Sequence, residues 1–189
     1  MQPQATTQEN KLPHPFEDEK LKNNHLNILL VSDIHMGTKK LEKLKSWFYD
    51  KYKQRVHYVF ASGDFDNIDN NNPSKTDNQI KQYENLSNIL AYLEFASVPI
   101  IYIPGNHDVP EILEKQTKLT QHSILIQNAS YKLAEGLQVV GCGGSIPAFT
   151  RKNGKSELFW EGYPYSSDND FGVDLRKALD KNCADKDMQ

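Results

Sequence analysis

Three apolar runs of the chain each end in acidic, amide or imidazole side chains, and this recurrence limits the fold more than any other feature. The runs are HLNILLVSDIH, VHYVFASGD and VPIIYIPGNHD, which begin at residues 25, 56 and 98. Their aliphatic and aromatic content predicts β-strands. Because hardly any polar residues alternate within them, we expect strands that are buried on both faces.

The segments between these runs have helical periodicity. The apolar positions of residues 39–53 fall on one helix face, as do those of residues 78–97. They are Leu41, Leu44, Phe48 and Tyr52 in the first segment, and Ile80, Tyr83, Leu86, Leu90 and Leu93 in the second. The resulting order of strand, helix, strand, helix, strand predicts an α/β fold with parallel strands and right-handed crossovers.

Parallel strands place their carboxyl ends at one edge of the sheet, where open α/β folds keep their sites. Asp33 and His35, then Asp64, then Asn106-His107-Asp108 are therefore predicted to lie close together. Their oxygen and nitrogen donors suit Zn, Mn or Fe. Neither cysteine has a histidine near it in sequence, and no Gly-x-Ser-x-Gly elbow offers a competing nucleophile.

The pattern changes after Pro110. Residues 111–120 predict a short helix, and residues 123–145 predict short strands of a second, antiparallel layer. Residues 151–170 are expected to be a loop, followed by a last helix that carries Phe171, Leu175 and Leu179. Within the polar loop after the second strand, Asp66 and Asp69 are expected to be solvated.

Composition excludes several classes of protein. A formal net charge of -3 with scattered Lys and Arg indicates no nucleic-acid patch, and no apolar segment is long enough to span a membrane. The polar start lacks the apolar core of a secretory signal, and only two distant cysteines, Cys142 and Cys183, are present. These features favour a cytoplasmic protein with a flexible tail at residues 1–24 and one domain over residues 25–189.

Taken together, the three strand ends resemble the motifs of the calcineurin-like metallophosphoesterases. The motifs are Asp33-x-His35, Gly63-Asp64-x-x-Asn67 and Gly105-Asn106-His107-Asp108. Each is weak by itself, and their order and position after apolar strands make the combination specific. The resemblance is closest over residues 26–110. It implies an αββα sandwich of two mixed sheets and a metal-dependent phosphoester hydrolase acting on a phosphorylated substrate.

The resemblance also implies residue roles. Asp33 and His35 would bind the first of two divalent ions (Mn, Fe or Zn), Asp64 would bridge both, and Asn106 would bind the second. Metal-bound hydroxide would attack phosphorus at this dinuclear site. His107 would stabilise charge or protonate the leaving group, and Asp108 would orient His107.

The chain departs from the family pattern downstream. Its six histidines are residues 14, 25, 35, 57, 107 and 122, so the further histidine and the Gly-His-x-His motif of the family are missing. We therefore interpret the chain as the amino-terminal part of a longer phosphoesterase, with an incomplete second sheet and an uncovered sheet edge. A site built from these residues would hold one ion, or hold its ions weakly.

Two other functions stay open at this stage. One is a catalytically impaired fragment that binds one metal ion, or binds a protein partner at the uncovered sheet edge. The other is a flavodoxin-like nucleotide binder, which shares the order of strands and helices. That class needs a glycine-rich or Ser/Thr phosphate loop after the first strand, whereas SDIHMGTKK offers a carboxylate that would repel phosphate.

Overall fold

The computed structural model describes residues 26–51, 56–66, 75–108, 118–134, 136–160 and 164–184. The elements run in the order β1 (Ile28–Val31), α1 (Thr38–Lys51), β2 (Tyr58–Ser62), α2 (Lys75–Leu93), η3 (Glu94–Ala96), β3 (Ile100–Ile103), β4 (Ser123–Leu125), β5 (Ala129–Ala134), β6 (Leu137–Gly141), β7 (Ala148–Lys152), β8 (Lys155–Trp160) and α4 (Asp168–Ala184). The predicted alternation of strands and helices up to β3 is confirmed. The tail predicted for residues 1–24 and most of the helix predicted for 111–120 lie outside the described residues.

The central sheet has four strands in the order β1-β2-β3-β4, and every neighbouring pair is parallel. The strand β4 corrects one expectation, because the sequence predicts that residues 123–125 belong to the antiparallel second layer. They instead extend the first sheet beside β3. In the described residues this sheet is wholly parallel, so the carboxyl ends of its strands share one edge.

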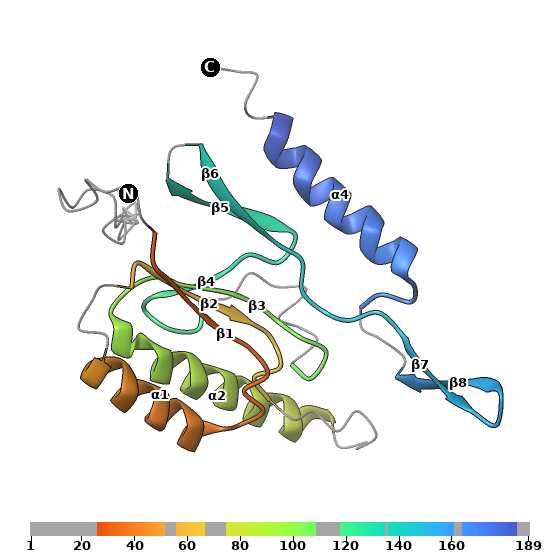
Figure 1. The fold of residues 1–189 in the computed structure, drawn as a ribbon, viewed down its shortest axis with the longest axis horizontal. Helices are drawn as coiled ribbons and strands as arrows, with labels where there is room; N and C mark the ends of the chain where they lie inside the picture. Colours follow the sequence, from red (N-terminus) through yellow and green to blue (C-terminus); the bar gives the residue numbers. More distant parts are fainter. Residues whose placement is uncertain are drawn as a thin grey trace, which may run out of the picture.

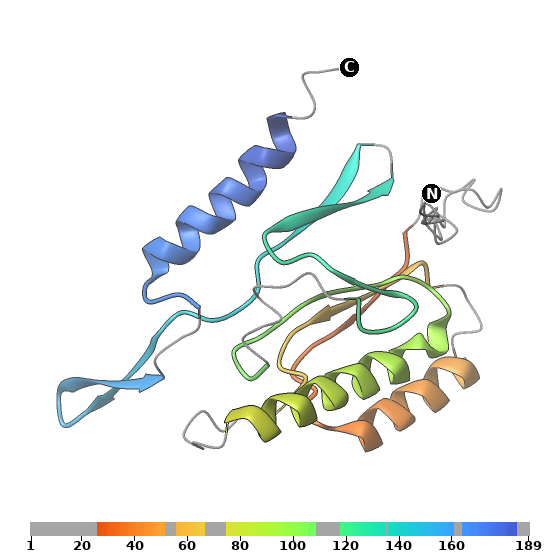
Figure 2. The same cartoon turned by 180° about the vertical axis from the view of Figure 1, so that it is seen from behind.

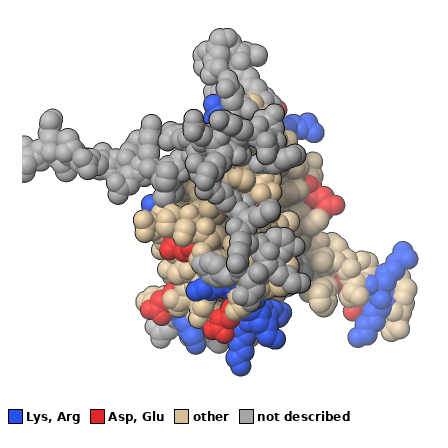
Figure 3. Space-filling model, turned by 60° about the vertical axis from the view of Figure 1, so that its left-hand side comes forward, with Lys and Arg blue, Asp and Glu red and all other residues tan. Residues whose placement is uncertain are grey.

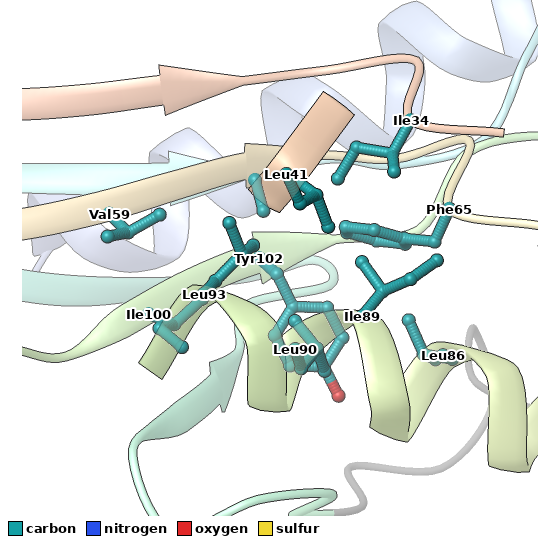
Figure 4. Close-up of a cluster of buried hydrophobic side chains, with 11 residues drawn as sticks. Ile34, Leu41, Val59, Phe65, Leu86, Ile89, Leu90, Leu93, Ile100 and Tyr102 are labelled. Atoms are coloured by element: carbon teal, nitrogen blue, oxygen red, sulfur yellow. The ribbon is translucent and has the colours of Figure 1, made fainter. Parts of the chain in front are cut away.

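One face of the sheet is covered by α1 and α2 (Figure 1). The core between sheet and helices includes Val59, Phe65, Leu90 and Tyr102, all fully or almost fully buried (Figure 4). The helical positions predicted for α2 are mostly correct, although Ile80 is exposed and Ile89 is buried in its place. Burial of this apolar face holds the helices, and thereby the crossovers, in position.

The strand β1 is less buried than its sequence suggests. β2 and β3 are covered on both faces for most of their length, but Ile28 and Leu30 of β1 are exposed, Leu30 by 67%. The two side chains share the face of the sheet opposite α1 and α2, because the intervening Leu29 packs into the helix-facing core. The prediction of burial on both faces is therefore wrong for β1, which is one of the two edge strands of this sheet in the described residues.

The second layer is the antiparallel hairpin of β5 and β6. Its Leu133 packs on Tyr58, Ile101 and Ile126, which come from the sheet face opposite the helices or follow β4. On the far side of the hairpin lies α4 (Figures 1 and 2). The layers are thus helix, sheet, sheet, helix, as predicted. In the described residues the two sheets are a parallel sheet and a single hairpin.

The described residues of the segment 151–170, which is predicted to be a loop, are mostly regular structure. β7 and β8 form an antiparallel hairpin whose turn is Asn153-Gly154, with positive φ at both residues. An Asn-Gly pair is a strong signal for this type of turn. The flanking residues are largely polar, so they do not show the apolar alternation that would have predicted strands. The last helix is confirmed as α4. Among the described residues, no helix combines the length and the apolar character needed to cross a bilayer.

A Leu90→Ala substitution tests the helix-facing core. Leu90 is fully buried, so its truncation should lower the free energy of unfolding by about 2–5 kcal/mol. Leu179→Ala is the matched control, since Leu179 is also helical but is 45% exposed, and it should lose less than about 1 kcal/mol. Urea denaturation followed by circular dichroism measures both, and equal losses would contradict this assignment of the core.

Candidate metal centre

Three of the predicted ligands meet at the carboxyl edge of the parallel sheet. One ligand atom from each of Asp33, His35 and Asp64 lies within 4.8 Å of the other two. Asp33 and His35 follow β1, and Asp64 follows β2, so the parallel pairing of these strands brings them together. Two carboxylates and an imidazole form a donor set that suits a divalent transition metal, and their spacing allows one ion to contact all three.

The backbone at this cluster is strained. Asp33, His35 and Asp64 all have positive φ, between 45° and 53°, a region that non-glycine residues seldom occupy. Such conformations cost of order 1–3 kcal/mol each and tend to collect at functional sites. Here the three residues in this conformation are the three whose ligand atoms converge. The strain therefore coincides with the residues that converge.

Backbone hydrogen bonds continue the β1-β2 pairing into the loops that carry the ligands. The amides of Asp33, His35 and Met36 donate to the carbonyls of Gly63, Asp64 and Phe65, at 3.2, 2.9 and 2.9 Å respectively. These bonds extend past the last paired residues of the two strands. As a result, the loop after β1 is held in register with the loop after β2.

The imidazole of His35 is oriented by a backbone carbonyl. Its Nδ1 lies 3.2 Å from the carbonyl oxygen of Asp66, which can only accept a hydrogen bond. Nδ1 therefore carries the proton, and Nε2 keeps the lone pair needed for metal binding. The residues present fit a divalent cation on this ground as well as by their spacing.

The loop after β3 packs directly against Asp64. The backbone N–H of His107 donates to Asp64 Oδ1 at 3.0 Å and so fixes that carboxylate. A Cβ on Gly105 would overlap the same oxygen and the Asp64 amide, and a Cβ on Gly63 would overlap the Gly105 backbone. Both glycines are needed for this close approach, and Gly63 in addition has positive φ.

The side chain of Asp108 bonds to the loop after β2 and to the loop after β3. Its Oδ1 accepts hydrogen bonds from the amides of Phe65 and Asp66, at 2.8 and 3.1 Å, and its Oδ2 accepts from the amide of Gly105 at 2.7 Å. The carboxyl group is buried. Asp108 thus binds the backbone on both sides of the site, a role that the sequence analysis did not foresee. Its predicted role in orienting His107 stays a prediction.

The environment of Asp108 shifts its acidity. Burial raises the pKa of Asp108 to about 6, and the nearby charge of Asp64 acts in the same direction. The three amide donors oppose this shift, because they stabilise the carboxylate, but they do not cancel it. The protein therefore holds a carboxyl group that gains its proton more readily when folded than when unfolded.

The remaining predicted site residues lie in the loop after β3. The ring of His107 stands edge-on to that of His35, with 5.1 Å between ring centroids, so His107 borders the cluster. Asn106 is half-buried and lies between Gly105 and His107, which both contact Asp64. The structure therefore brings all six predicted residues to one edge of the sheet. The individual roles in metal binding and catalysis stay predictions.

Other candidate residues lie elsewhere or have structural roles. His122 precedes β4 at the opposite edge of the sheet, and its backbone N–H donates to Glu94 Oε1 at 2.9 Å. His57 precedes β2 at that edge, and its Nδ1 accepts from the Asn27 amide. The expectation that Asp66 is solvated is wrong, because Asp66 is buried and accepts a hydrogen bond from Asn85. Asp69 and Asn67 lie outside the described residues.

Comparison with known proteins identifies the class. The family model of the calcineurin-like phosphoesterases matches residues 26–185, which is most of the chain. The chain therefore belongs to the calcineurin-like phosphoesterase family, as the resemblance of its motifs implied. None of the curated proteins is similar enough to count as a match.

A solved structure agrees on the fold. TT1561 of Thermus thermophilus is 17% identical, with a TM-score of 0.51, and the match covers 81% of this chain and 61% of TT1561. A second solved structure is 16% identical with a TM-score of 0.49, over 63% of this chain and 53% of that protein. The chain thus spans 61% and 53% of the lengths of these two proteins, which is less than two thirds of either.

A Gly105→Ala substitution tests the close approach between the two loops. The added methyl group would displace the Asp64 carboxylate, so Mn²⁺ affinity should fall by roughly 100-fold in isothermal titration calorimetry. Gly172→Ala is the control, because a Cβ at Gly172 in α4 meets no atom within 4 Å. It should leave Mn²⁺ affinity unchanged. Equal affinities in the two variants would contradict the packing described here.

The raised pKa of Asp108 predicts a pH dependence of stability in the metal-free protein. Between the unfolded pKa near 3.9 and the folded pKa of about 6, the native state binds more protons than the unfolded state. The free energy of unfolding should therefore fall by up to about 3 kcal/mol as the pH rises through this interval. Urea denaturation in the presence of a chelator measures it. Asp108→Asn removes the titrating group, so an identical pH profile in this variant would refute the assignment.

Proposed function

We propose that this protein hydrolyses phosphoesters at a divalent-cation site formed by Asp33, His35 and Asp64. The convergence of these three donors, in a chain of the calcineurin-like phosphoesterase family, is the observation that supports the proposal. A cation bound there would supply Lewis acidity at the phosphoryl oxygens and would lower the pKa of a water molecule. Asn106, which borders Asp64, is the proposed ligand of a second cation, with Asp64 shared between the two.

The negative charge of the site suits a cation better than a bare phosphate. Asp33 and Asp64 each contribute a carboxylate, and no Lys or Arg of the described residues is paired with either one in a salt bridge. A phosphate group would be repelled by these carboxylates unless a cation lay between them. This repulsion also disfavours the flavodoxin-like nucleotide binder, which needs amide or cationic donors at this edge of the sheet.

His107 is the proposed acid or charge-stabilising group. Its ring contacts that of His35, so a phosphate held beside His35 would lie within reach of the His107 imidazole. A positioned histidine can donate a proton to a leaving oxygen, or stabilise the charge that develops on it. The backbone N–H of His107 donates a hydrogen bond to Asp64. This bond fixes the position of the His107 imidazole relative to the proposed cation site.

Hydrolysis of p-nitrophenyl phosphate and bis(p-nitrophenyl) phosphate with added Mn²⁺ tests the proposal. His107→Gln should lower kcat by about 10²–10⁴-fold with little change in Mn²⁺ affinity, because the imidazole acts on the substrate. Asp64→Asn should lower both activity and Mn²⁺ affinity. His122→Gln is the matched control, since His122 lies at the opposite edge of the sheet, and it should retain full activity.

Two outcomes would contradict the proposal. If Asp64→Asn hydrolysed either ester as well as the native protein, the activity would not depend on this site. If the native protein bound Mn²⁺ but cleaved neither ester, the chain would be a metal-binding fragment without catalysis.

A further inference from the structure

Asp66 is a buried acidic residue beside the candidate metal centre. The surface in Figure 3 carries Lys, Arg, Asp and Glu side chains of both charges, as water-exposed surfaces commonly do. Asp66 differs from these residues, because it is only 6% exposed. A buried carboxylate is costly unless hydrogen bonds compensate for the water that it loses. Its side chain therefore needs donors within the protein, and α2 supplies one.

The donor on α2 is the side-chain amide of Asn85. Its Nδ2 donates to Asp66 Oδ2 at 3.2 Å, and Asn85 is itself half-buried. The next residue, Leu86, is almost fully buried in the helix-facing core, so this turn of α2 is firmly packed. Asparagine is one of the weaker helix formers, and helix stability therefore does not explain its place in the interior of α2. The hydrogen bond to Asp66 gives it a role there.

Three groups of Asp66 are bonded to three different parts of the protein. Its backbone N–H donates to Asp108 Oδ1 at 3.1 Å, and its carboxylate accepts from Asn85. Its carbonyl oxygen lies 3.2 Å from Nδ1 of His35. Because the Cα atom is tetrahedral, fixing the directions of its bonds to N and Cβ also fixes the direction of its bond to the carbonyl carbon. The hydrogen bond from Asn85 is therefore one of two that place this carbonyl opposite His35.

We propose that Asn85 is a positioning residue for His35 and acts through Asp66. Its hydrogen bond holds the Asp66 carbonyl where this group accepts the Nδ1 proton of His35, which keeps the lone pair of the ring on Nε2. The use of that lone pair for a cation rests on the proposed function. Groups that orient a metal-binding histidine typically change metal affinity by about 10–100-fold when they are removed.

Nuclear magnetic resonance of the metal-free protein in a chelator tests the proposal without any cation. The Nδ1 proton of His35, assigned by the signal that His35→Gln removes, should exchange with water more slowly than that of free imidazole. Asn85→Ala should raise its exchange rate by about tenfold, because a hydrogen bond to a charged group is lost. Asn88→Ala is the matched control, since Asn88 is exposed on the same helix, and it should leave the rate unchanged. An unchanged rate in Asn85→Ala would overturn the proposal.

A double variant shows whether Asn85 acts through the Asp66 side chain. Asp66→Ala should raise the exchange rate at least as much as Asn85→Ala does, because it removes the same hydrogen bond. In the Asp66→Ala protein, adding Asn85→Ala should have no further effect, as expected for two residues that act as one unit. Effects that simply add would contradict this path from α2 to His35.

Isothermal titration calorimetry with Mn²⁺ measures the consequence for the candidate metal centre. Asn85→Ala should lower the Mn²⁺ affinity by about tenfold, and Asn88→Ala should not change it. Urea denaturation checks that both variants fold. A less stable Asn85→Ala protein with native proton exchange and native Mn²⁺ affinity would overturn the proposal, because Asn85 would then only stabilise the fold. If the native chain bound no Mn²⁺, the proposed function would fail, and the exchange rates would still decide the role of Asn85.

Discussion

The candidate site depends on the buried carboxyl group of Asp108. It accepts amide hydrogen bonds from Phe65 and Asp66 after β2 and from Gly105 after β3, so two loops from neighbouring strands share one acceptor group. A buried backbone donor that loses its partner costs about 1–3 kcal/mol, and two of the three donors that converge here are buried. The loop after β1 is joined to the same assembly by backbone bonds to Gly63, Asp64 and Phe65. The cluster of ligands is therefore a consequence of loop-to-loop bonding as much as of the sheet.

The strands that carry the site residues differ in how far the neighbouring layers bury them. β2 and β3 lie between the α1-α2 face and the β5-β6 hairpin, so the strand ends that carry Asp64 and His107 are anchored in cores on both sides. β1 has its helix-facing side buried, and its other side exposes Leu30. Asp33 and His35 are thus held chiefly by pairing with β2 and by the bonds between the loops.

The sequence predicted the parts of this structure that periodicity and parallel pairing control. The alternation of strands and helices up to β3, the shared carboxyl edge, and the meeting of Asp33, His35 and Asp64 all follow from apolar runs with polar ends. The position of β1 at the edge of the sheet could not be predicted, because the exposure of Leu30 depends on which elements lie beyond β1. The hydrogen bonds that the loop after β2 donates to Asp108 could not be predicted either, since they join groups far apart in sequence. The Asn153-Gly154 pair could have predicted the β7-β8 turn, but its polar neighbours lack the apolar alternation that is typical of strands.

Anomalous diffraction from crystals of the protein soaked with Mn²⁺ tests the central claim most directly. We expect a manganese peak within about 2.0–2.6 Å of carboxylate oxygens of Asp33 and Asp64 and of Nε2 of His35, with Nδ1 still facing the Asp66 carbonyl. A manganese peak located elsewhere on the protein would contradict it. So would a structure in which these three side chains point away from one another.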